Sequence, residues 1–457
     1  MTSPMTSAAH DEPWEEPLDP TARGVPGDGR RAARWLPRLL PRGTDVPEDL
    51  RAHVARYGGP PYRGAAQLLV GDVRAAGLTG RGGAAFPVHR KLAAVLDAAR
   101  RSRYSRPVVV ANGAESEPAS EKDATLLWLA PHLVLDGLQL AAEAVGADQA
   151  ILCVHAHRGG DVGIALRRAL AERDGAQIDK VPVELAEAPP RFLAGQETAL
   201  VNRLGGGPAL PTFVPPRVTE RGLGNAPTLV QNVETLAHLA LIARYGPRWF
   251  RAAGTELEPG SMLCTLRRAD GVSRITEVPL GTPLCDLLGG RDVEGTVLVG
   301  GYHGTWIPAG KAAALTLDSQ SLRGAGASPG AGILITLPPT ACGLAETARV
   351  ARYLALESAG QCGPCLNGLP RIAGALDELA GPRPRRRTVE DVQRWAGLVT
   401  GRGACHHPDG TARFVRSALI AFAGELGLHE RGRCSATSRK WFLPVPADPA
   451  RTEEDWM

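Results

Sequence analysis

The late part of the chain carries cysteines at a spacing that suits a metal centre. Cys362 and Cys365 form a Cys-x-x-Cys pair at the expected start of a helix, and Cys405 lies further along the chain. Such a pair with a remote third cysteine is typical of an iron–sulfur cluster. Cys-Gly-Pro-Cys is also the thioredoxin redox sequence, but thioredoxin places it between a strand and a helix, whereas here an amphipathic helix precedes it. We therefore expect cluster ligation, with dithiol redox chemistry and purely structural cysteines as the alternatives.

A glycine-rich loop earlier in the chain could hold an anion or a flat ring. Gly80, Gly82 and Gly83 allow backbone amides to approach a phosphate closely. A helix is expected to begin near Pro87, and its N-terminal dipole would add to the attraction for an anion. Lys91, one of only five lysines, lies one turn into that helix. The loop predicts anion or cofactor binding, with an ordinary turn as the alternative.

Three further segments carry polar side chains that could contact a cofactor. Asn112, Glu115 and Glu117 directly follow an apolar strand, where they could bond to ribityl or ribose hydroxyls and to a ring edge. Residues 192–198 (FLAGQET) and 230–235 (VQNVET) add a glycine for close approach and more polar groups. Each segment by itself is also compatible with a polar turn.

The remaining cysteines do not suggest a disulfide framework. Eight cysteines in so long a chain, clustered late, are typical of a cytosolic protein with a cofactor. Cys153, Cys264 and Cys285 lie in apolar strand or helix patterns and are expected in the core. Cys434 lies in a charged tail, and the pattern assigns it no role.

The elements that must position the first motifs alternate between strands and helices. Apolar runs over 107–111, 150–154 and 181–185 predict strands, and the periodicity of 126–145 and 162–171 predicts helices. This alternation predicts a parallel sheet with helices on its faces, and therefore an α/β fold. Ligands of such folds bind at the carboxyl ends of the strands.

The second half of the chain changes character twice. Short strands separated by glycine-rich turns, with one short helix near 283–288, predict a small β-grasp module at 258–337; these strands are 262–266, 273–278, 296–299 and 333–337. Helical periodicity then predicts a four-helix bundle within 340–430, with helices at 344–357, 366–379, 389–399 and 412–426. The sequence thus divides into five parts. A disordered leader at 1–45 and an α/β domain at 46–250 precede the β-grasp module and the helical bundle, and a tail at 431–457 follows them.

Composition excludes several classes of function. The 457 residues include 52 Lys and Arg against 48 Asp and Glu, and a net charge of +4 gives no global attraction to nucleic acid or membrane. The N-terminus lacks an apolar secretory segment, and no uncharged run could form a membrane-spanning helix. We therefore expect a cytoplasmic protein without a direct membrane span, which could reach a membrane only through a complex.

Taken in order, these motifs resemble the flavoprotein subunit of respiratory Complex I and the diaphorase subunits of NAD-linked hydrogenases and formate dehydrogenases. That family carries a GRGGAGFP loop followed by a lysine, an NADExEPG segment, GEETAL, VNNVET, and ESCGxCxPC with a distant fourth cysteine. The resemblance spans about residues 48 to 430. The variants at 87–91 and 112–118 also resemble a related membrane-complex subunit that couples NADH to ferredoxin.

The resemblance implies FMN in a Rossmann-like first domain, a β-grasp soluble-ligand-binding module and a [4Fe-4S] cluster on the helical bundle. It implies that Glu117 and Glu197 lie at the flavin and nicotinamide as catalytic residues, and that Phe86 forms one wall of the adenine pocket. Cys362, Cys365 and Cys405 would be the cluster ligands. The FMN-binding positions are Gly80, Arg81, Gly82, Lys91, Asn112, Glu115, Phe192, Gly195, Gln196, Gln231, Asn232 and Thr235.

Several positions depart from the family pattern. Ala114, Gln196 and Gln231 replace an Asp, a Glu and an Asn, while Ala94 and Arg217 stand where the family has adenine-clasping aromatics. Each lost ring removes on the order of 1 kcal/mol of stacking, although Arg217 could stack on adenine or hold a 2′-phosphate.

The cluster ligand set is one cysteine short, because Ala359 replaces the family's first cysteine. A [4Fe-4S] cluster completed by water or by His406 or His407, a [3Fe-4S] or labile cluster, and no cluster remain open. Cys342 is a poor substitute, since a helix about 20 Å long separates it from Cys362.

The leading hypothesis is an FMN-dependent NAD(P)H oxidoreductase that passes electrons through an iron–sulfur centre to a ferredoxin-like protein or to other redox subunits of a quinone-reductase complex. The alternative is an electron-relay or interaction subunit that keeps FMN but no longer oxidises NADH. A structural protein that binds neither cofactor is the third possibility.

Overall fold

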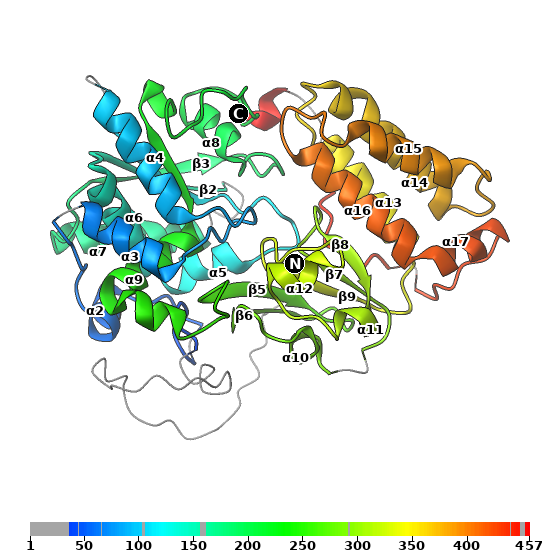
Figure 1. The fold of residues 1–457 in the computed structure, drawn as a ribbon, viewed down its shortest axis with the longest axis horizontal. Coiled ribbons are helices and arrows are strands. Elements are labelled where there is room, and N and C mark those ends of the chain that lie inside the picture. The colour runs from blue at the N-terminus through cyan, green and yellow to red at the C-terminus, as the bar shows by residue number, and fades with distance from the viewer. Residues whose placement is uncertain are drawn as a thin grey trace.

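The computed structural model describes residues 36–43, 45–64, 66–102, 106–155, 161–290, 293–438, 440–447 and 453–457. Within these residues the chain forms two β-sheets and a bundle of helices (Figure 1). Most of the predicted leader lies outside the described residues.

The first sheet has four parallel strands in the order β3-β2-β1-β4, which confirms the parallel sheet expected from the alternating pattern. Its strands are β1 (Val108–Gly113), β2 (Gln149–His155), β3 (Val183–Ala188) and β4 (Thr228–Asn232). Val109 and Ala111 of β1 face one hydrophobic core, while Val108 and Val110 face another. Helices therefore cover both faces of the sheet.

The larger core is built by helices whose apolar residues recur at helical spacing. They are α2 (Leu50–Tyr57), α3 (Ala66–Ala76), α4 (Val88–Arg101), α5 (Lys122–Leu129), α6 (Pro131–Val145), α7 (Asp161–Gly175) and α9 (Val233–Arg251), while α8 (Glu197–Leu204) packs on the other face. The helix predicted over 126–145 is two helices, because Pro131 at the N-terminus of α6 follows a bend of 96°. No single described helix is long and apolar enough to cross a membrane, and only this bent pair meets the length and hydropathy criteria.

The second sheet has the strand order β6-β5-β9-β7-β8, with β5 and β9 parallel and the other pairs antiparallel. This arrangement is the predicted β-grasp. Its strands are β5 (Ser261–Arg267), β6 (Ser273–Pro279), β7 (Thr296–Val299), β8 (Thr305–Pro308) and β9 (Ile333–Leu337), and its short helices are α10 (Leu284–Leu288), α11 (Ala309–Ala312) and α12 (Ser319–Arg323). Strand β8 was not predicted, since its four residues lie among glycines.

The helical part packs against one face of this second sheet. Its helices are α13 (Gly343–Leu356), α14 (Leu369–Ala380), α15 (Thr388–Val399), α16 (His407–Ala421) and α17 (Ala423–Glu430). The predicted fourth helix is thus divided at Phe422 into α16 and α17. Leu298, Ile333 and Ile335 of the sheet share one core with α13–α16, and α10–α12 cover the opposite face.

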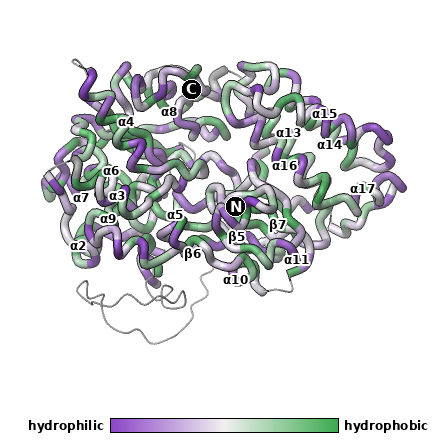
Figure 2. The backbone as a smooth tube through the Cα atoms, viewed as in Figure 1, coloured by the Kyte–Doolittle hydropathy of each residue, from purple (hydrophilic) through white to green (hydrophobic). Residues whose placement is uncertain are grey.

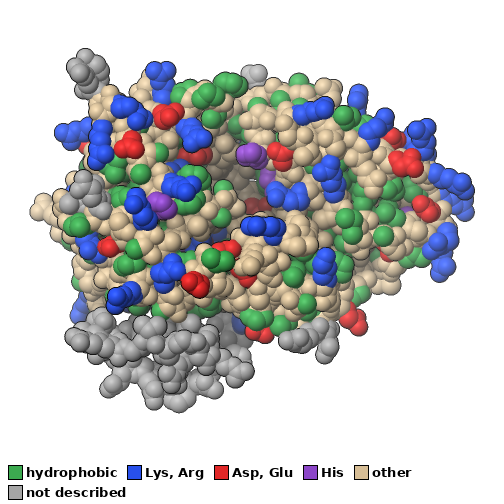
Figure 3. Space-filling view, viewed as in Figure 1, with side chains coloured by type: hydrophobic (Ala, Val, Ile, Leu, Met, Phe, Trp, Pro, Cys, Tyr) green, Lys and Arg blue, Asp and Glu red, His purple; other side chains and the backbone are tan. Residues whose placement is uncertain are grey.

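The three parts surround a central hollow. Figure 3 shows this hollow between the α/β part and the other two, with basic, acidic and histidine side chains around it. Figure 2 shows apolar backbone segments gathered inside each part, whereas the far end of the bundle near α17 is hydrophilic.

Residues 36–43 differ from the leader expected up to residue 45. Leu39 is fully buried, and the amides of Arg38 and Leu39 donate to the Glu277 carboxylate of β6 at 2.6 and 2.8 Å. Two adjacent leucines are enough to fasten this short segment to the core. At the other end, the amide of Ala209 donates to the Trp456 carbonyl at 2.6 Å, so part of the predicted tail lies against the α/β part.

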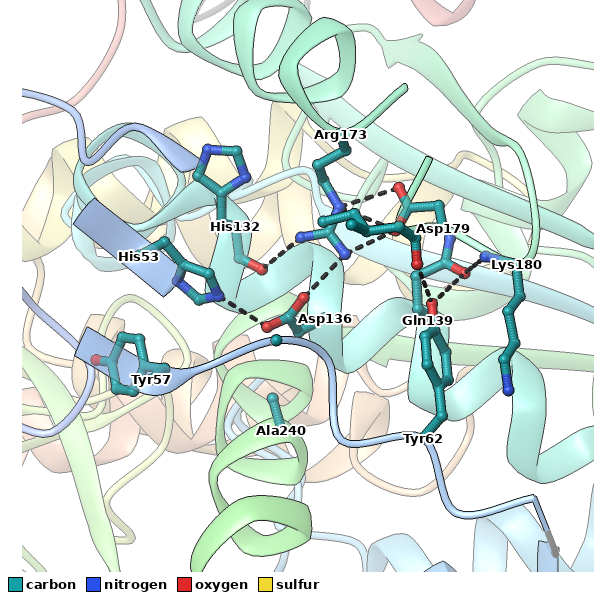
Figure 4. Close-up of polar contacts among 12 residues, drawn as sticks. His53, Tyr57, Tyr62, His132, Asp136, Gln139, Arg173, Asp179, Lys180 and Ala240 are labelled. Atoms are coloured by element: carbon teal, nitrogen blue, oxygen red, sulfur yellow. Dashed lines mark hydrogen bonds and ion pairs between the residues drawn. The ribbon is translucent and has the colours of Figure 1, made fainter. Parts of the chain in front are cut away.

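A buried ion network holds the helical layer behind the first sheet. Asp136 of α6 contacts His53 Nε2 and Arg173 Nη2, each at 2.8 Å (Figure 4). It also pairs with Arg244. These partners outweigh the cost of burial and hold the pKa of Asp136 well below its usual range. The network fastens α2, α7 and α9 to α6.

Candidate functional site

The predicted cofactor residues gather at the carboxyl edge of the first sheet. Asn112 at the end of β1 and Asn232 at the end of β4 are register partners on neighbouring strands. In the order β3-β2-β1-β4, strands β2 and β3 are added on one side of β1, and β4 is added on its other side. This is the switch point at which doubly wound sheets bind their ligands.

The glycine-rich loop lies over the end of β4. A side chain at Gly82 would come within 3.3 Å of Asn232 Cβ, so the loop approaches this strand closely. The Arg81 amide donates to Thr235 Oγ1 at 2.9 Å, while its buried guanidinium donates to the carbonyls of Ser261 and Pro259. Arg81 therefore fixes the loop to β5 with its side chain and to α9 with its amide.

Lys91 reaches the same edge from the first turn of α4. Its Nζ donates to the Val230 carbonyl of β4 at 2.7 Å and pairs with Glu197 Oε1 at 2.8 Å. Both Lys91 and Glu197 are partly exposed. The structure thus brings one cation and one of the two predicted catalytic carboxylates together at the mouth of the edge.

The loop at 192–196 approaches Asn112 without space for a side chain. Asn112 Nδ2 donates to the Gly195 carbonyl at 2.8 Å, and the Gly195 amide donates to Ser116 Oγ at 2.9 Å. A Cβ at Gly195 would lie 2.5 Å from both the Ala114 carbonyl and Ser116 Oγ. This contact explains why glycine stands at this position.

The side chains of three predicted cofactor residues accept backbone amides at helix N-termini. Glu115 accepts the amides of Asp123 and Ala124 at the start of α5, and Gln196 accepts two amides at the start of α8. Asn232 caps α9 through its Oδ1. Gln231 differs from these, because its buried Nε2 has no hydrogen-bond partner among the described residues. An unpaired buried donor near the carboxyl end of β4 fits a polar ligand at this edge.

A charged network that sequence reasoning missed lies directly beneath this edge. Buried Lys122 Nζ contacts Asp123 Oδ1 at 2.6 Å and Glu234 Oε2 at 2.8 Å, and Asn232 Nδ2 donates to Asp123 Oδ2 at 2.7 Å. Glu234 Oε1 also accepts the Leu263 amide of β5 at 2.8 Å. The scarcity of lysine was the one available signal for Lys122.

The second predicted catalytic carboxylate faces the β-grasp part. Glu117 Oε2 accepts the Tyr302 amide at 3.0 Å, and Gly301, at φ +82°, packs against the carboxylate. Burial raises the pKa of Glu117 to about 8, against the lowering effect of the Tyr302 and Ala119 amides. A carboxyl group with such a pKa can gain or lose a proton near neutral pH.

Phe192 points toward the helical part. Its ring lies 4.8 Å from that of His303 and 5.6 Å from that of His407. His407 Nε2 contacts the Leu354 carbonyl at 2.8 Å, which leaves its Nδ1 to accept from His303 Nε2 at 3.1 Å. Burial lowers the pKa of both histidines, so this aromatic cluster is uncharged.

The three predicted cluster cysteines line one cavity of about 420 Å³. Cys362 and Cys365 come from the turn before α14, and Cys405 comes from the turn before α16. The residues around them include Ala359, Ala404, Pro211 and Phe213. A cavity of this size lined by three thiols fits an iron–sulfur cluster held by three cysteines.

Backbone amides favour one thiolate in this cavity. Burial opposes ionisation of Cys362, but the amides of Ala404 and Cys365 donate to its sulfur and lower its pKa. Burial and the neighbouring Cys362 raise the pKa of Cys365 to about 12, and burial raises that of Cys405. A bound metal would reverse the latter two shifts.

No fourth cysteine and no histidine lies among the described residues that line the cavity. Ala359 stands at the wall in the place expected for a cysteine. His406 is fully exposed and pairs with Asp409, and both nitrogens of His407 are engaged. Cys342 lies elsewhere, as the N-cap of α13.

The predicted nucleotide residues are less enclosed. Phe86 is 50% exposed. Arg217 is also exposed, and its backbone amide donates to Glu220 Oε2. Ala94 lies on α4 and is partly exposed. The described residues therefore offer no closed aromatic clasp at these three positions.

Two family models match the chain. One describes the Nuo51 FMN-binding domain and matches residues 73–241, and the other describes the iron–sulfur binding region of NADH-ubiquinone oxidoreductase-F and matches 345–429. The NADH-quinone oxidoreductase F subunit numbered 2 of Rhizobium meliloti is 30% identical over 426 residues, covering 87% of this chain and 98% of the relative. The corresponding protein of Streptomyces coelicolor is 29% identical, over 84% of this chain and 85% of the relative.

Among solved structures, the chain is similar to NAD⁺-reducing [NiFe]-hydrogenase in its H₂-reduced state, with a TM-score of 0.71 and 28% identity. The match covers 80% of this chain but 62% of the hydrogenase chain. The air-oxidized state gives a TM-score of 0.70 at 27% identity, over 85% of this chain and 65% of that chain.

Proposed function

Because the chain belongs to the family of NADH-quinone oxidoreductase F subunits, we propose that it oxidises a reduced nicotinamide nucleotide with FMN and passes the electrons through an iron–sulfur centre to another redox protein. The observation that carries the proposal is the connection between the two sites. The loop at 191–196 borders the carboxyl edge of the first sheet, and Arg191 Nε of the same loop lies 3.0 Å from Glu357, which precedes the cysteine segment.

We propose that FMN lies at the carboxyl edge between β1 and β4. Bound FMN would accept a hydride and release its two electrons singly. The amides of the glycine loop, the N-terminus of α4 and the Lys91 ammonium would hold the phosphate. Asn112 and Asn232 would border the ribityl chain and the ring, and the unpaired Gln231 Nε2 would gain an acceptor.

Glu117 and Glu197 would lie near the flavin and the nicotinamide in this proposal. Glu197 is paired with Lys91, so it would orient that ammonium as well as contact the nucleotide. Glu117 would hold a proton below about pH 8, since burial raises its pKa to about 8. Its bond to the Tyr302 amide would keep this carboxyl group in place.

We propose that Cys362, Cys365 and Cys405 hold the iron–sulfur centre, with one iron lacking a cysteine ligand at Ala359. The electron acceptor would be a ferredoxin-like protein or another member of a redox complex, as the relatives' description as oxidoreductase subunits suggests. We further propose a cytoplasmic location, with any membrane contact made through that complex.

A second candidate function is an FMN-containing electron relay that has lost NADH oxidation. The exposed Phe86 and Arg217 and the small Ala94 favour it, because they give adenine little stacking surface. Stopped-flow measurement of flavin bleaching by NADH and by NADPH separates the two functions. Slow bleaching by both nucleotides supports the relay, and faster bleaching by NADPH supports a role for Arg217 at a 2′-phosphate.

The proposal as a whole is tested by visible and EPR spectra of anaerobically purified protein before and after addition of NADH. We expect a flavin spectrum that bleaches and an iron–sulfur EPR signal that appears on reduction. Absence of stoichiometric flavin after incubation with excess FMN would overturn it.

A further inference from the structure

A second group of metal-ligating side chains lies at the far end of the bundle. Cys342, Glu425, His429 and Cys434 each offer one ligand atom, and these four atoms lie within 4.8 Å of one another. Cys342 is the N-cap of α13, Glu425 and His429 lie one turn apart on α17, and Cys434 follows α17 in the chain. We call these four residues the α17 site.

The distances within the α17 site are close to those between the ligands of a tetrahedral zinc ion. Cys342 Sγ lies 3.6 Å from His429 Nε2, and this nitrogen lies 3.1 Å from Glu425 Oε1. Zinc bonds of about 2.3 Å to sulfur and 2.0–2.2 Å to nitrogen and oxygen put tetrahedral ligands about 3.4–3.8 Å apart. The side chains would need only a small adjustment to close on the ion.

Outer contacts already orient the ligands. His429 is buried, and its Nδ1 lies 2.8 Å from the Leu379 carbonyl, to which it can only donate. In the neutral ring, Nε2 then directs its lone pair at the Cys342 sulfur and the Glu425 carboxylate. Such a carbonyl–histidine contact is the usual support of a metal-bound imidazole.

The other ligands are held in the same way. Ser435 donates its amide to Glu425 Oε1 at 2.9 Å and its hydroxyl to Oε2. The Ala345 amide at the N-terminus of α13 donates to Cys342 Sγ at 3.4 Å, which holds this sulfur in position. His429, Glu425 and Cys342 are therefore oriented before any ion binds.

We propose that the α17 site binds one Zn²⁺ through Cys342, Cys434, His429 and Glu425, with a structural role. Two sulfurs, one imidazole and one carboxylate form a closed four-ligand set of the type that zinc favours. Binding releases the thiol protons and fastens residues 433–438 to α13, where Thr437 and Ser438 already donate to the Thr340 carbonyl.

The α17 site is separate from the cysteine cavity. Cys342 precedes α13 and Cys362 follows it, and a helix of 14 residues spans about 20 Å. Cys342 is thus engaged with Cys434 and His429 at the opposite end of the helix from the cluster cysteines. The proposal does not depend on the proposed function.

Metal analysis of the full-length protein, purified with a reductant and without chelator, tests the proposal. We expect about one zinc per chain in addition to iron, and tetrahedral thiolate absorption after exchange with Co²⁺. Cys434→Ser, at an exposed position, should weaken zinc binding by about 10-fold or more while leaving iron unchanged. Cys362→Ser is the matched control and should reduce iron while leaving zinc unchanged.

Two results would overturn the proposal. One is failure of the reduced wild-type protein to bind Zn²⁺ or Co²⁺ at this stoichiometry, including the case in which mass spectrometry finds a Cys342–Cys434 disulfide instead. The other is zinc binding that survives both Cys434→Ser and Cys342→Ser. Circular dichroism of the variants verifies that they are folded.

Discussion

Arg191 Nε lies 3.0 Å from Glu357 Oε2, and the same oxygen accepts the Phe192 amide at 2.9 Å. Both side chains are buried. The loop that borders the proposed flavin position and the segment that leads to the cysteines are therefore held by one carboxylate. We expect this contact to fix the distance between the proposed flavin position and the cysteine cavity.

Glu357→Ala should destabilise the protein by about 3 kcal/mol, because it leaves the buried Arg191 cation without its closest partner. Thermal unfolding of the wild type and the variant measures the loss. Asp97→Ala, which removes an exposed pair with Arg100, is the control and should change stability by less than about 1 kcal/mol. Equal changes in the two variants would contradict a special role for Glu357.

Lys91→Ala should weaken FMN retention, because it removes the cation that lies at the mouth of the sheet edge beside Glu197. The loss of a charge-assisted contact corresponds to about 2 kcal/mol, or about 30-fold in affinity. Flavin content after dialysis measures it. Lys180→Ala removes a surface pair with Glu143 and should leave the flavin content unchanged.

Gly195→Ala should also reduce flavin binding, since its Cβ would lie 2.5 Å from the Ala114 carbonyl and from Ser116 Oγ. The loop must move away from Asn112 to relieve this overlap. Gly374→Ala is the matched control, because no atom lies within 4 Å of the added Cβ in α14. If FMN titration gives the same affinity for both variants, the close approach at Gly195 has no role in binding.

Ala359→Cys should raise the iron content and stabilise the cluster, because it adds a thiol to the wall of the cysteine cavity. Cys405→Ala should abolish the cluster and loosen the bundle. Iron analysis and EPR after anaerobic reconstitution measure both effects. A wild-type protein with four irons and the EPR signal of a four-cysteine cluster would show that another thiolate serves as ligand.

Acidification should destabilise the fold through His132. Burial, followed by the His53 and Arg173 charges, lowers the pKa of His132 to about 4, so the folded protein keeps this ring neutral. Between its ordinary pKa of about 6.5 and about 4, the unfolded chain binds one more proton than the folded one. Its contribution, present above about pH 6.5, is lost as the pH falls and amounts to about 3 kcal/mol.

Urea unfolding at pH 7 and at pH 5 measures this effect. His132→Gln, which keeps a side-chain donor near Glu172, should lose less stability between the two pH values than the wild type does. Identical losses in the two proteins would assign the pH dependence to other groups.

The order of elements was predictable because hydrophobic periodicity distinguishes strands from helices. The runs at 107–111 and 150–154 correspond to the parallel strands β1 and β2, and the five-stranded sheet has the predicted β-grasp arrangement. The short strand β8 was missed, because four residues between glycines carry too little periodic signal. The break before Pro131 was missed because apolar residues continue through it.

The direction of individual side chains was not predictable. A motif places Arg81, Glu115 and Gln196 near a cofactor, but their side chains bind neighbouring backbone groups instead. The residues that approach Phe192 come from segments more than 100 positions away, as His303 does. Sequence spacing carries no information on such long-range contacts, and the α17 site was missed for the same reason.

The bond from the Leu263 amide to Glu234 has a consequence for work with recombinant fragments. Residues 258–337 expressed alone would lose this acceptor, and with it the contact that joins β5 to α9. They would also expose the sheet face of Leu298 and Ile335, which the bundle covers in the whole chain. An uncovered apolar face of this kind promotes aggregation, so the β-grasp part should be soluble only when its neighbours are expressed with it.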